Sequence, residues 1–349
     1  DVNTNVILPY KSDGTYTGTI DWGDGNTTTN TFANKTHTYA STGTYQIKIF
    51  GRSSKIRFLE YDDSNNDQFT KLVQFGDPMQ FELLSFGGAV NTSNGGANNM
   101  DFSQVTDTPN FDTGASLYYL LSDIDVNNFN KIGNWDVSNV TDMERVFEGN
   151  TTFNQNLNSW DVSSVTTMEA MFQYAESFNQ ALNSWDVSSV TNMSGMFKEA
   201  YVFNQPLNNW DVSSVTNMGV MFRGDLNGPS SPSTTFNQDI DDWDVSNVTT
   251  FSGMFANNED FNQYLGSWDV SSATDINSTF RAAVSYNQVL NNWNVSNVTQ
   301  MRFVFSYAES FNQDLNSWDT SNVTNMDGMF SFTDVFNGNI TSWDVSNVT

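Results

Sequence analysis

The sequence predicts a repeat solenoid of coils about 25 residues long, with a small β-sandwich-like domain ahead of it. Each coil is expected to hold a short strand and a short helix, and the strands to form a parallel sheet. Three observations lead to this fold class: tryptophans recur at a nearly fixed spacing, the apolar pattern changes within each unit, and the first 51 residues lack the repeat and alternate as strands do.

Tryptophans set the period of the repeat. Seven of the eight steps between them are 25 residues, along Trp135, Trp160, Trp185, Trp210, Trp243, Trp268, Trp293, Trp318 and Trp343. The step of 33 residues contains an eight-residue insertion between Phe222 and Phe236. A fixed period of 20 to 50 residues is typical of a solenoid, in which each unit buries its apolar face against its neighbours.

Within one unit the apolar period changes from two to that of a helix. In SWDVS, Trp160 and Val162 alternate with polar residues, which predicts a short strand with one buried face. A helical stripe follows at Met168, Met171, Phe172 and Ala175. Thr166 precedes this stripe and Glu169 stands three residues later, the spacing of a helix capping box.

An asparagine recurs in the FNQ loop of every unit. In stacked coils, its side chain can satisfy backbone groups of its own coil and of the next one. We therefore expect a structural ladder of Asn154, Asn179, Asn204, Asn237, Asn262, Asn287 and Asn312, with Asn130 and Asn337 at equivalent positions. The preceding aromatic residues, such as Phe153 and Phe178, are expected to stack as a spine.

The motif FNQxLNxWDVSxVTxMxxMF resembles the BspA-like repeats of bacterial surface proteins, which are relatives of leucine-rich repeats. Regular repeats cover residues 129–349, and residues 52–128 are interpreted as diverged capping repeats, with LVQFGDPMQFELLSFGG at 72–88 as an example. Because the sequence stops partway through a unit, we expect the native chain to continue past residue 349.

Residues 1–51 have a different character. Strand-like alternation, a Gly–Asp–Gly turn at 23–25 and a second turn at 41–43 predict a small antiparallel domain. The pattern IDWGDG…HTYASTGTYQIKI resembles PKD-type immunoglobulin-like domains, which act as spacers in extracellular proteins. The copy is short, and we expect it to be incomplete at its start.

The charge of the chain restricts its partners. There are 13 Lys and Arg against 40 Asp and Glu, a formal net charge of −27. Such a surface repels nucleic acid and anionic membranes and favours cations, basic proteins or neutral polymers such as glycans. No apolar run reaches the ~18 residues that predict a membrane-spanning helix, so no direct membrane insertion is expected. The oligomeric state does not follow from the sequence.

The aspartates that follow the tryptophans are candidate Ca²⁺ ligands. They are Asp136, Asp161, Asp186, Asp211, Asp244, Asp269, Asp319 and Asp344. Stacked carboxylates repel, so each needs a cation or hydrogen-bond donors. The alternative is that each Asp accepts hydrogen bonds from its own Asp-x-Ser turn. Asn294 replaces one Asp, keeping the hydrogen-bonding capacity without the charge, and this favours the structural interpretation.

Other candidate interaction sites lie outside the regular motif. Arg223, Gly224 and Asp225 form an RGD at the start of the insertion, where flanking Gly and Pro residues favour an exposed loop. The tryptophans could stack on sugar rings, but they share the inward phase of the repeat, which favours core packing. Weaker candidates for exposed aromatic contacts are Tyr174, Tyr201, Tyr264 and Tyr307.

The residues argue against an enzyme. There is no cysteine, and His37 is the sole histidine, which excludes zinc sites and Ser/Cys–His nucleophiles in practice. No acidic pair interrupts the repeat as a glycosidase pair would, and no phosphate-binding glycine loop occurs. We expect no catalytic residue and no cofactor, with Ca²⁺ as the one candidate ion.

By resemblance, the chain is expected to be an extracellular, adhesin-like protein of the bacterial cell surface. It would bind glycans or proteins through a repetitive acidic solenoid surface, and some proteins of this layout use type IX secretion. Three alternatives remain: a stalk or surface-layer spacer without its own ligand, a polysaccharide-binding module of a larger secreted enzyme, and a viral or phage surface protein.

Overall fold

The computed structural model describes residues 4–57, 80–85, 105, 107–123, 131–226 and 231–349. The chain divides into two compact units. Unit 1 comprises residues 1–150 and 159–164, and unit 2 comprises residues 151–158 and 165–349. Asn130 and most of the segment 72–88 lie outside the described residues.

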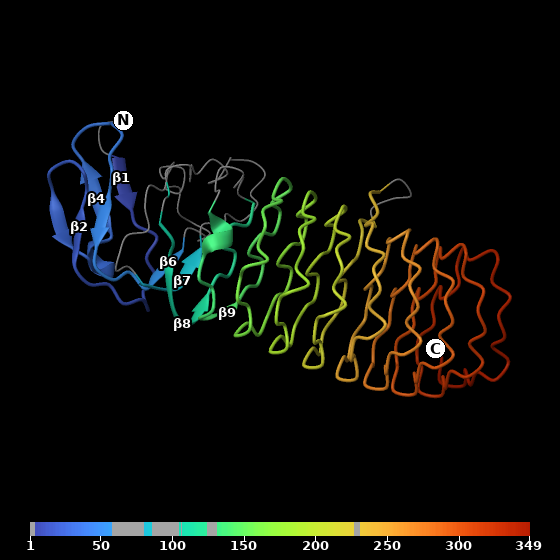
Figure 1. Ribbon diagram of the computed structural model, residues 1–349. Coiled ribbons are helices and arrows are strands. Elements are labelled where there is room, and N and C mark those ends of the chain that lie inside the picture. Colours follow the sequence, from blue (N-terminus) through green and yellow to red (C-terminus); the bar gives the residue numbers. More distant parts are fainter. Residues whose placement is uncertain (1–3, 58–79, 86–104, 106, 124–130, 227–230) are drawn as a thin grey trace. The chain divides into compact units, whose positions relative to one another are not determined.

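The start of unit 1 is antiparallel (Figure 1). One two-stranded sheet pairs β1 with β4, and a three-stranded sheet places β2 between β3 and β5. Ile20 and Trp22 are fully buried beside this sheet, which gives the segment a small core of its own. The elements are β1 (Thr4–Ile7), β2 (Thr19–Asp21), β3 (Thr27–Thr29), the 3-10 helix η1 (Phe32–Asn34), β4 (Thr36–Tyr39) and β5 (Lys48–Phe50).

The rest of unit 1 contains a parallel sheet of four short strands in the order β6-β7-β8-β9. Its register shifts within β8, and the 3-10 helix η3 (Ile132–Asn134) leads into Trp135. The strands are β6 (Lys55–Arg57), β7 (Gln80–Ser85), β8 (Asn110–Ser116) and β9 (Val140–Asp142).

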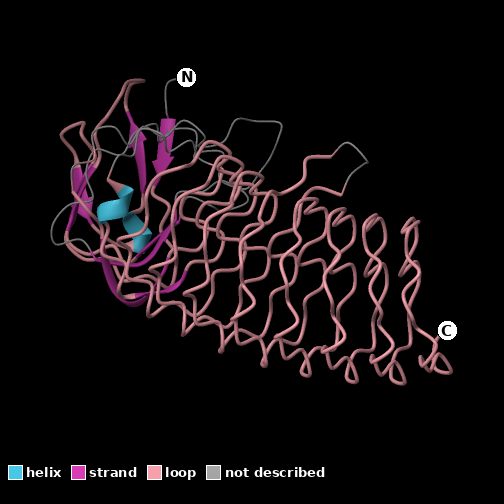
Figure 2. Ribbon diagram, turned by 45° about the vertical axis from the view of Figure 1, so that its right-hand side comes forward, coloured by secondary structure: helices cyan, strands magenta, loops and turns pink. Residues whose placement is uncertain are grey.

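The repeats of unit 2 consist of turns and loops, without a helix or an extended strand in the part that the structure describes (Figure 2). Neighbouring repeats meet through single parallel bridges at one equivalent position. These bridges link Thr167, Asn192, Asn217, Thr250, Asp275, Gln300 and Asn325 in succession.

The predicted helix after each tryptophan is wrong. The N–H groups of Met168 and Ala170 donate to carbonyls of the next repeat, Asn192 and Ser194, at 3.0 and 2.8 Å. The intervening Met171 N–H instead bonds back three residues to the Met168 carbonyl at 3.2 Å. Positive φ at Ala170 (52°) breaks the run of helical dihedrals. Half of the amides therefore join repeats rather than form a helical ladder.

The fold class predicted from the sequence is accordingly corrected. The described residues contain no α-helix, the SWDVS segments of unit 2 are not strands, and unit 2 has no parallel sheet. The protein is not a parallel-sheet solenoid of strand-plus-helix coils. The alternation at Trp185, Asp186 and Val187 does place the apolar pair inside and the carboxylate outside, but in irregular backbone.

Stacked aromatic rings form the core of unit 2. One row places rings 5.7 to 6.4 Å apart through Phe153, Phe178, Phe203, Phe236, Phe261, Tyr286, Phe311 and Phe336. A second row starts at Phe172 and Phe197, whose centroids are 5.6 Å apart. Phe172 also lies 4.1 Å from Phe178, so the two rows interleave. Tryptophans stack beside them, as Trp268 and Trp293 do at 6.4 Å.

Candidate ligand-binding surfaces of the repeats

Each aspartate after a tryptophan sits at the start of a tight turn. In the Asp161 turn, Oδ1 accepts the Ser163 N–H at 3.1 Å and the Ser163 hydroxyl at 2.6 Å. The same backbone bond recurs in the other repeats, and Asn294 accepts it from the Ser296 N–H at 3.2 Å. The turns therefore already supply donors to the carboxylates.

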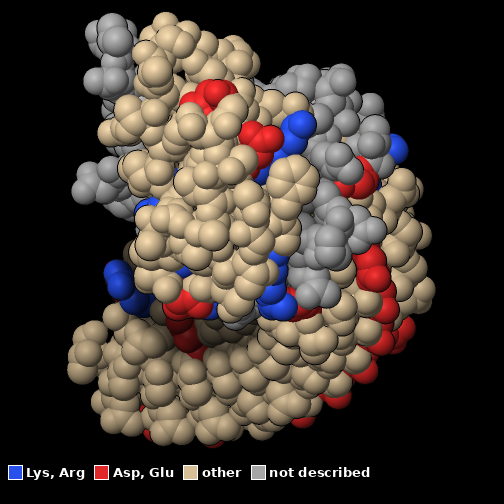
Figure 3. All heavy atoms as spheres, turned by 90° about the vertical axis from the view of Figure 1, so that its left-hand side faces the viewer, with Lys and Arg blue, Asp and Glu red and all other residues tan. Residues whose placement is uncertain are grey.

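These hydrogen bonds favour the ionised carboxylate. The Ser163 hydroxyl, and then its N–H, holds the pKa of Asp161 below its usual range, and Ser271 does the same for the pKa of Asp269. Acidic side chains follow one another along one edge of the stacked repeats (Figure 3). Among the described residues, however, no group of three or more Asp, Glu, His or Cys is placed to hold a metal ion. The structure thus places each candidate Ca²⁺ ligand in its own turn.

The FNQ asparagines contact one another along unit 2. Asn154 Oδ1 accepts the Asn179 N–H at 3.0 Å and the Gln180 side-chain amide at 2.9 Å. The pair of bonds recurs with Asn179, Asn204, Asn237, Asn262 and Asn287 as acceptors. Asn312 accepts from the Asn337 N–H. Their side chains are half-buried or exposed, because the bonds join the edges of the loops.

A threonine row, which the sequence had suggested as a helix cap, also links repeats. The Thr191 N–H and hydroxyl both donate to the Thr166 carbonyl, at 2.9 and 3.1 Å. Equivalent bonds continue through Thr216, Thr249, Thr274, Thr299, Thr324 and Thr349. The capping role is wrong because no helix follows, and a hydroxyl that donates to the carbonyl of the preceding repeat explains why Thr recurs.

The tryptophans are buried and hydrogen-bonded. The Trp185 indole N–H donates to the Leu157 carbonyl at 3.0 Å, and the same bond recurs at Trp210, Trp243, Trp268, Trp293 and Trp318. About 2 to 3% of each of these residues is exposed. They have no face free for a sugar ring, so stacking on a ligand has to use other aromatics.

The RGD of the insertion lies against the next repeat. Gly224 is buried, and its N–H donates to the Ala256 carbonyl at 2.8 Å. Asn257 donates its side-chain amide to the Asp225 carbonyl at 2.5 Å. Arg223 and Asp225 are half-buried. The tripeptide therefore follows the hydrogen bonding of the repeat, although an insertion begins directly after it.

The four tyrosine candidates differ in accessibility. Tyr174 is covered by Lys198, whose Nζ lies 2.8 Å from the hydroxyl and 4.7 Å from the ring centroid. Tyr201 donates to Glu199 at 3.1 Å. Tyr264 and Tyr307 are 44% and 42% exposed. Tyr307 also stacks on Phe332 at 4.4 Å, which makes it part of a larger aromatic surface.

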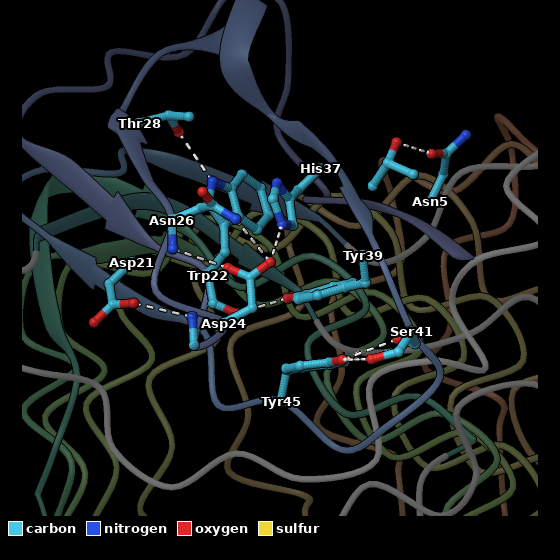
Figure 4. A network of polar contacts seen from close by, with 12 residues as sticks. Asn5, Asp21, Trp22, Asp24, Asn26, Thr28, His37, Tyr39, Ser41 and Tyr45 are labelled. Carbon is cyan, nitrogen blue, oxygen red and sulfur yellow. Dashed lines mark hydrogen bonds and ion pairs between the residues drawn. The ribbon is translucent and has the colours of Figure 1, made fainter. Parts of the chain in front are cut away.

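His37 belongs to a network in the N-terminal segment (Figure 4). Its Nε2 lies 2.8 Å from an Asp24 carboxylate oxygen, and its ring stacks on Trp22 at 4.8 Å. This contact, followed by the Asn26 donors, lowers the pKa of Asp24 to about 2. The Tyr39 hydroxyl donates to the Trp22 carbonyl at 2.8 Å. The network joins the Gly–Asp–Gly turn to β4, which is a structural role for the histidine.

Sequence reasoning missed one cluster of cationic and aromatic side chains, in which Arg302 is exposed and Arg281 and Phe303 are half-buried. The guanidinium carbons of Arg281 and Arg302 both lie over the Phe303 ring, at 5.5 and 5.3 Å from its centroid. Their positions in the repeat differ, so the motif gives no sign of the contact. The rarity of basic residues in residues 151–349 was the signal available.

Stacked repeats with recurring turn, Asn and Thr rows define a repeat protein. The family described as "Mycoplasma protein of unknown function, DUF285" matches residues 115–231, 230–295 and 265–349. The chain belongs to this family, since the matches span more than half of its 349 residues, and the expected BspA-like repeats are confirmed. The resemblance of residues 1–51 to PKD-type domains stays a prediction.

No curated protein and no solved structure matches the chain. Within the described residues, no helix has the length and apolar character needed to cross a membrane.

Proposed function

We propose that this protein is an extracellular, adhesin-like protein of the bacterial cell surface that binds glycans or proteins through its repeats. The observation that carries this proposal is the recurrence of the same exposed groups in successive units, as in the turns at Asp186 and Asp211. Identical shallow sites in series allow many weak contacts to add up, because each contact raises the effective concentration for the next.

The charge supports a neutral or basic partner. With a net charge of −27, the surface attracts cationic protein segments and tolerates neutral sugars, while long polyanions are repelled. Hydroxyl and amide groups at the exposed Asn, Ser and Thr positions match the hydrogen-bonding groups of a glycan. Membership of a BspA-like repeat family agrees with a surface location.

One observation favours a second function, a spacer without a ligand of its own. The Asp, Asn and Thr rows use their polar atoms within the turn or toward a neighbouring repeat, as the bonds of Asn179 to Asn154 and of Thr191 to Thr166 illustrate. A surface that is satisfied internally has less to gain from a partner. A spacer needs only that the repeats stack stably.

Binding of the purified chain to arrays of glycans and extracellular-matrix proteins tests the two functions. The array is probed with millimolar Ca²⁺ and again with chelator. Selective binding supports the adhesin, and we expect it to persist with chelator because serine donors already serve the carboxylates. Absence of binding under both conditions supports the spacer.

A further inference from the structure

We propose that Arg281, Arg302, Phe303 and Tyr307 form a site for a carboxylate-bearing sugar residue of a glycan. The inference deepens the proposed function and rests on it. It commits to an acidic pyranose as occupant, because guanidinium groups and open aromatic rings occur together here in an otherwise acidic chain.

The basic residues of residues 151–349 are confined to one part of the repeat. There are four of them. Lys198, Arg223 and Arg281 lie two residues after the second Met of the motif or its equivalent, and Arg302 lies one residue after the first Met. The Asp-x-Ser turns and the FNQ loops in the same stretch contain none. An anionic group that approaches these repeats therefore meets a positive charge on this segment alone, and only in the four repeats that carry one of these residues.

Arg281 and Arg302 come from adjacent repeats and meet at Phe303. Their guanidinium carbons lie 5.5 and 5.3 Å from its ring centroid. The ring occupies the space over Gly328, where a Cβ would stand 2.4 Å from a ring carbon. Because Gly328 has no Cβ, the Phe303 ring fits against it, and both guanidinium groups lie over this ring in cation–π contact.

The two arginines are only partly neutralised. Arg302 pairs with Asp327 at 3.3 Å, with 45% and 61% of the side chains exposed, a geometry that water screens strongly. For Arg281, no ion pair occurs among the residues that the structure describes. A planar guanidinium with unused donors suits a carboxylate, because two parallel N–H groups match its two oxygens.

Tyr307 supplies an aromatic platform four residues after Phe303. It is 42% exposed although the next repeat already covers it with Phe332, whose centroid is 4.4 Å away. The equivalent residue of the preceding repeat is Ala282, which carries only a methyl group. Sugars pack their C–H faces on rings of this kind, so Tyr307 offers a surface for the uncharged part of the ligand.

Tyr174, which occupies the position of Tyr307 in an earlier repeat, offers an internal comparison. There Lys198 bonds to the tyrosine hydroxyl and covers the ring, and it also lies 3.7 Å from Glu199. The Lys198 ammonium and the Tyr174 ring therefore contact each other, and less of either is left for a ligand. The same residue types form a closed contact at Tyr174 and an accessible one around Phe303 and Tyr307.

A longer polyanion fits the chain less well than one acidic sugar. The site has two arginines, while the whole chain carries a net charge of −27 that repels nucleic acid. An oligosaccharide with one carboxylate per two sugars spaces its charges so that a single carboxylate can enter the site. Hyaluronan hexasaccharide has this composition and is the probe that we choose.

The test is titration calorimetry of the full chain with hyaluronan hexasaccharide and with its carboxyl-reduced, neutral form. We expect the acidic form to bind at least roughly tenfold more tightly, and Arg281→Ala or Arg302→Ala to weaken it by about the same factor. Arg281→Lys keeps the charge and loses the planar fork, so it should lie in between. Tyr307→Ala should weaken both forms of the sugar.

Matched variants guard against indirect effects. Lys198→Ala removes a cation of the closed contact, and Tyr264→Ala removes an equally exposed tyrosine of the FNQ loop, and neither should change the affinity. Equal affinity for the acidic and neutral sugars, or arginine variants that bind as the native chain does, would overturn the inference. So would preferential binding of a dT hexanucleotide or of an acidic peptide.

The failure of this site and the failure of the proposed function give different results. If the array finds selective ligands whose binding ignores the arginine variants, the adhesin stands and the acidic-sugar site is wrong. If neither the array nor the hexasaccharide shows binding, both proposals fall.

Discussion

Tyr286 occupies a position where neighbouring repeats carry Phe261 and Phe311. Its hydroxyl is buried and has no hydrogen-bond partner among the described residues, and burial raises its pKa well above the usual value. We expect Tyr286→Phe to leave the fold intact and to raise the free energy of unfolding by up to about 1 kcal/mol, because an unsatisfied buried hydroxyl is removed. Urea unfolding monitored by fluorescence measures the change.

Tyr10→Phe is the matched control for that substitution. Tyr10 is also buried, but its hydroxyl donates to the Asn30 side chain at 2.8 Å and accepts from Ser53. Its loss should lower stability by roughly 1 kcal/mol. A Tyr286→Phe protein that is destabilised as much as the Tyr10→Phe protein would contradict the account of the Tyr286 hydroxyl.

The Asp-x-Ser turns make a prediction about pH. The pKa of Asp269 is lowered by the Ser271 hydroxyl and N–H, so the turn contributes stability above pH of about 4 and loses it as the pH falls through the lowered pKa. Asp269→Ala should therefore cost about 0.5 kcal/mol at pH 7 and less once the carboxyl is protonated at low pH, because the neutral carboxyl is the weaker acceptor. Asp269→Asn should stay close to the native chain at pH 7, as the natural Asn294 turn suggests. Unfolding curves at several pH values decide this.

At the scale of the element, the segment after each tryptophan depends on residues with positive φ. Equivalent positions hold Ala170, Gly195, Gly253 and Ser278, all between 52° and 64°. Such a conformation costs a residue with a Cβ roughly 1 kcal/mol relative to glycine. Ser278→Gly should therefore be more stable than Ser278→Ala by about that amount, as measured by the urea midpoint. Equal stability of the two variants would show that this backbone is relaxed.

The sequence predicted the repeat but not its local conformation. Trp160 and Val162 were correctly placed inside and Asp161 outside, because burial follows the polar pattern. The stripe from Met168 to Ala175 indicated a helix because bonds back over three residues bring the same side chains to one face. Glycines at equivalent positions, such as Gly195 and Gly253, are the sequence signal of positive φ, whereas Ala170 itself gives none because the cost there is offset by its hydrogen bond to the next repeat.

Of the candidate binding surfaces, too, only part could be predicted from the sequence. A row of FNQ asparagines could be foreseen, because one residue type recurs at one position and its partners are its own copies. The contact between Arg281 and Arg302 at Phe303 could not, because it joins different positions of two repeats. Its geometry depends on the ring lying over Gly328. A contact between residues that depart from the repeat motif cannot be predicted from the motif.

At the scale of the whole molecule, the chain combines a small antiparallel segment, a short parallel sheet and a long series of turn-built repeats. The aromatic rows and the Asn and Thr rows stabilise the stacking, which leaves the exposed side chains to vary from unit to unit. Acidic turns recur in every repeat except that of Asn294, whereas the cluster at Arg281 and Phe303 occurs once among the residues that the structure describes. Multiple weak contacts and one stronger anchor are compatible with adhesion.

The measurement that tests the central claim most directly is binding of the purified chain to arrayed glycans and extracellular-matrix proteins, with Ca²⁺ and with chelator. The account predicts selective binding that survives chelation, since the turns satisfy the carboxylates without a metal ion. Binding that disappears with chelator would contradict the structural role assigned to the Asp-x-Ser turns. An array without any selective ligand would contradict the adhesin itself.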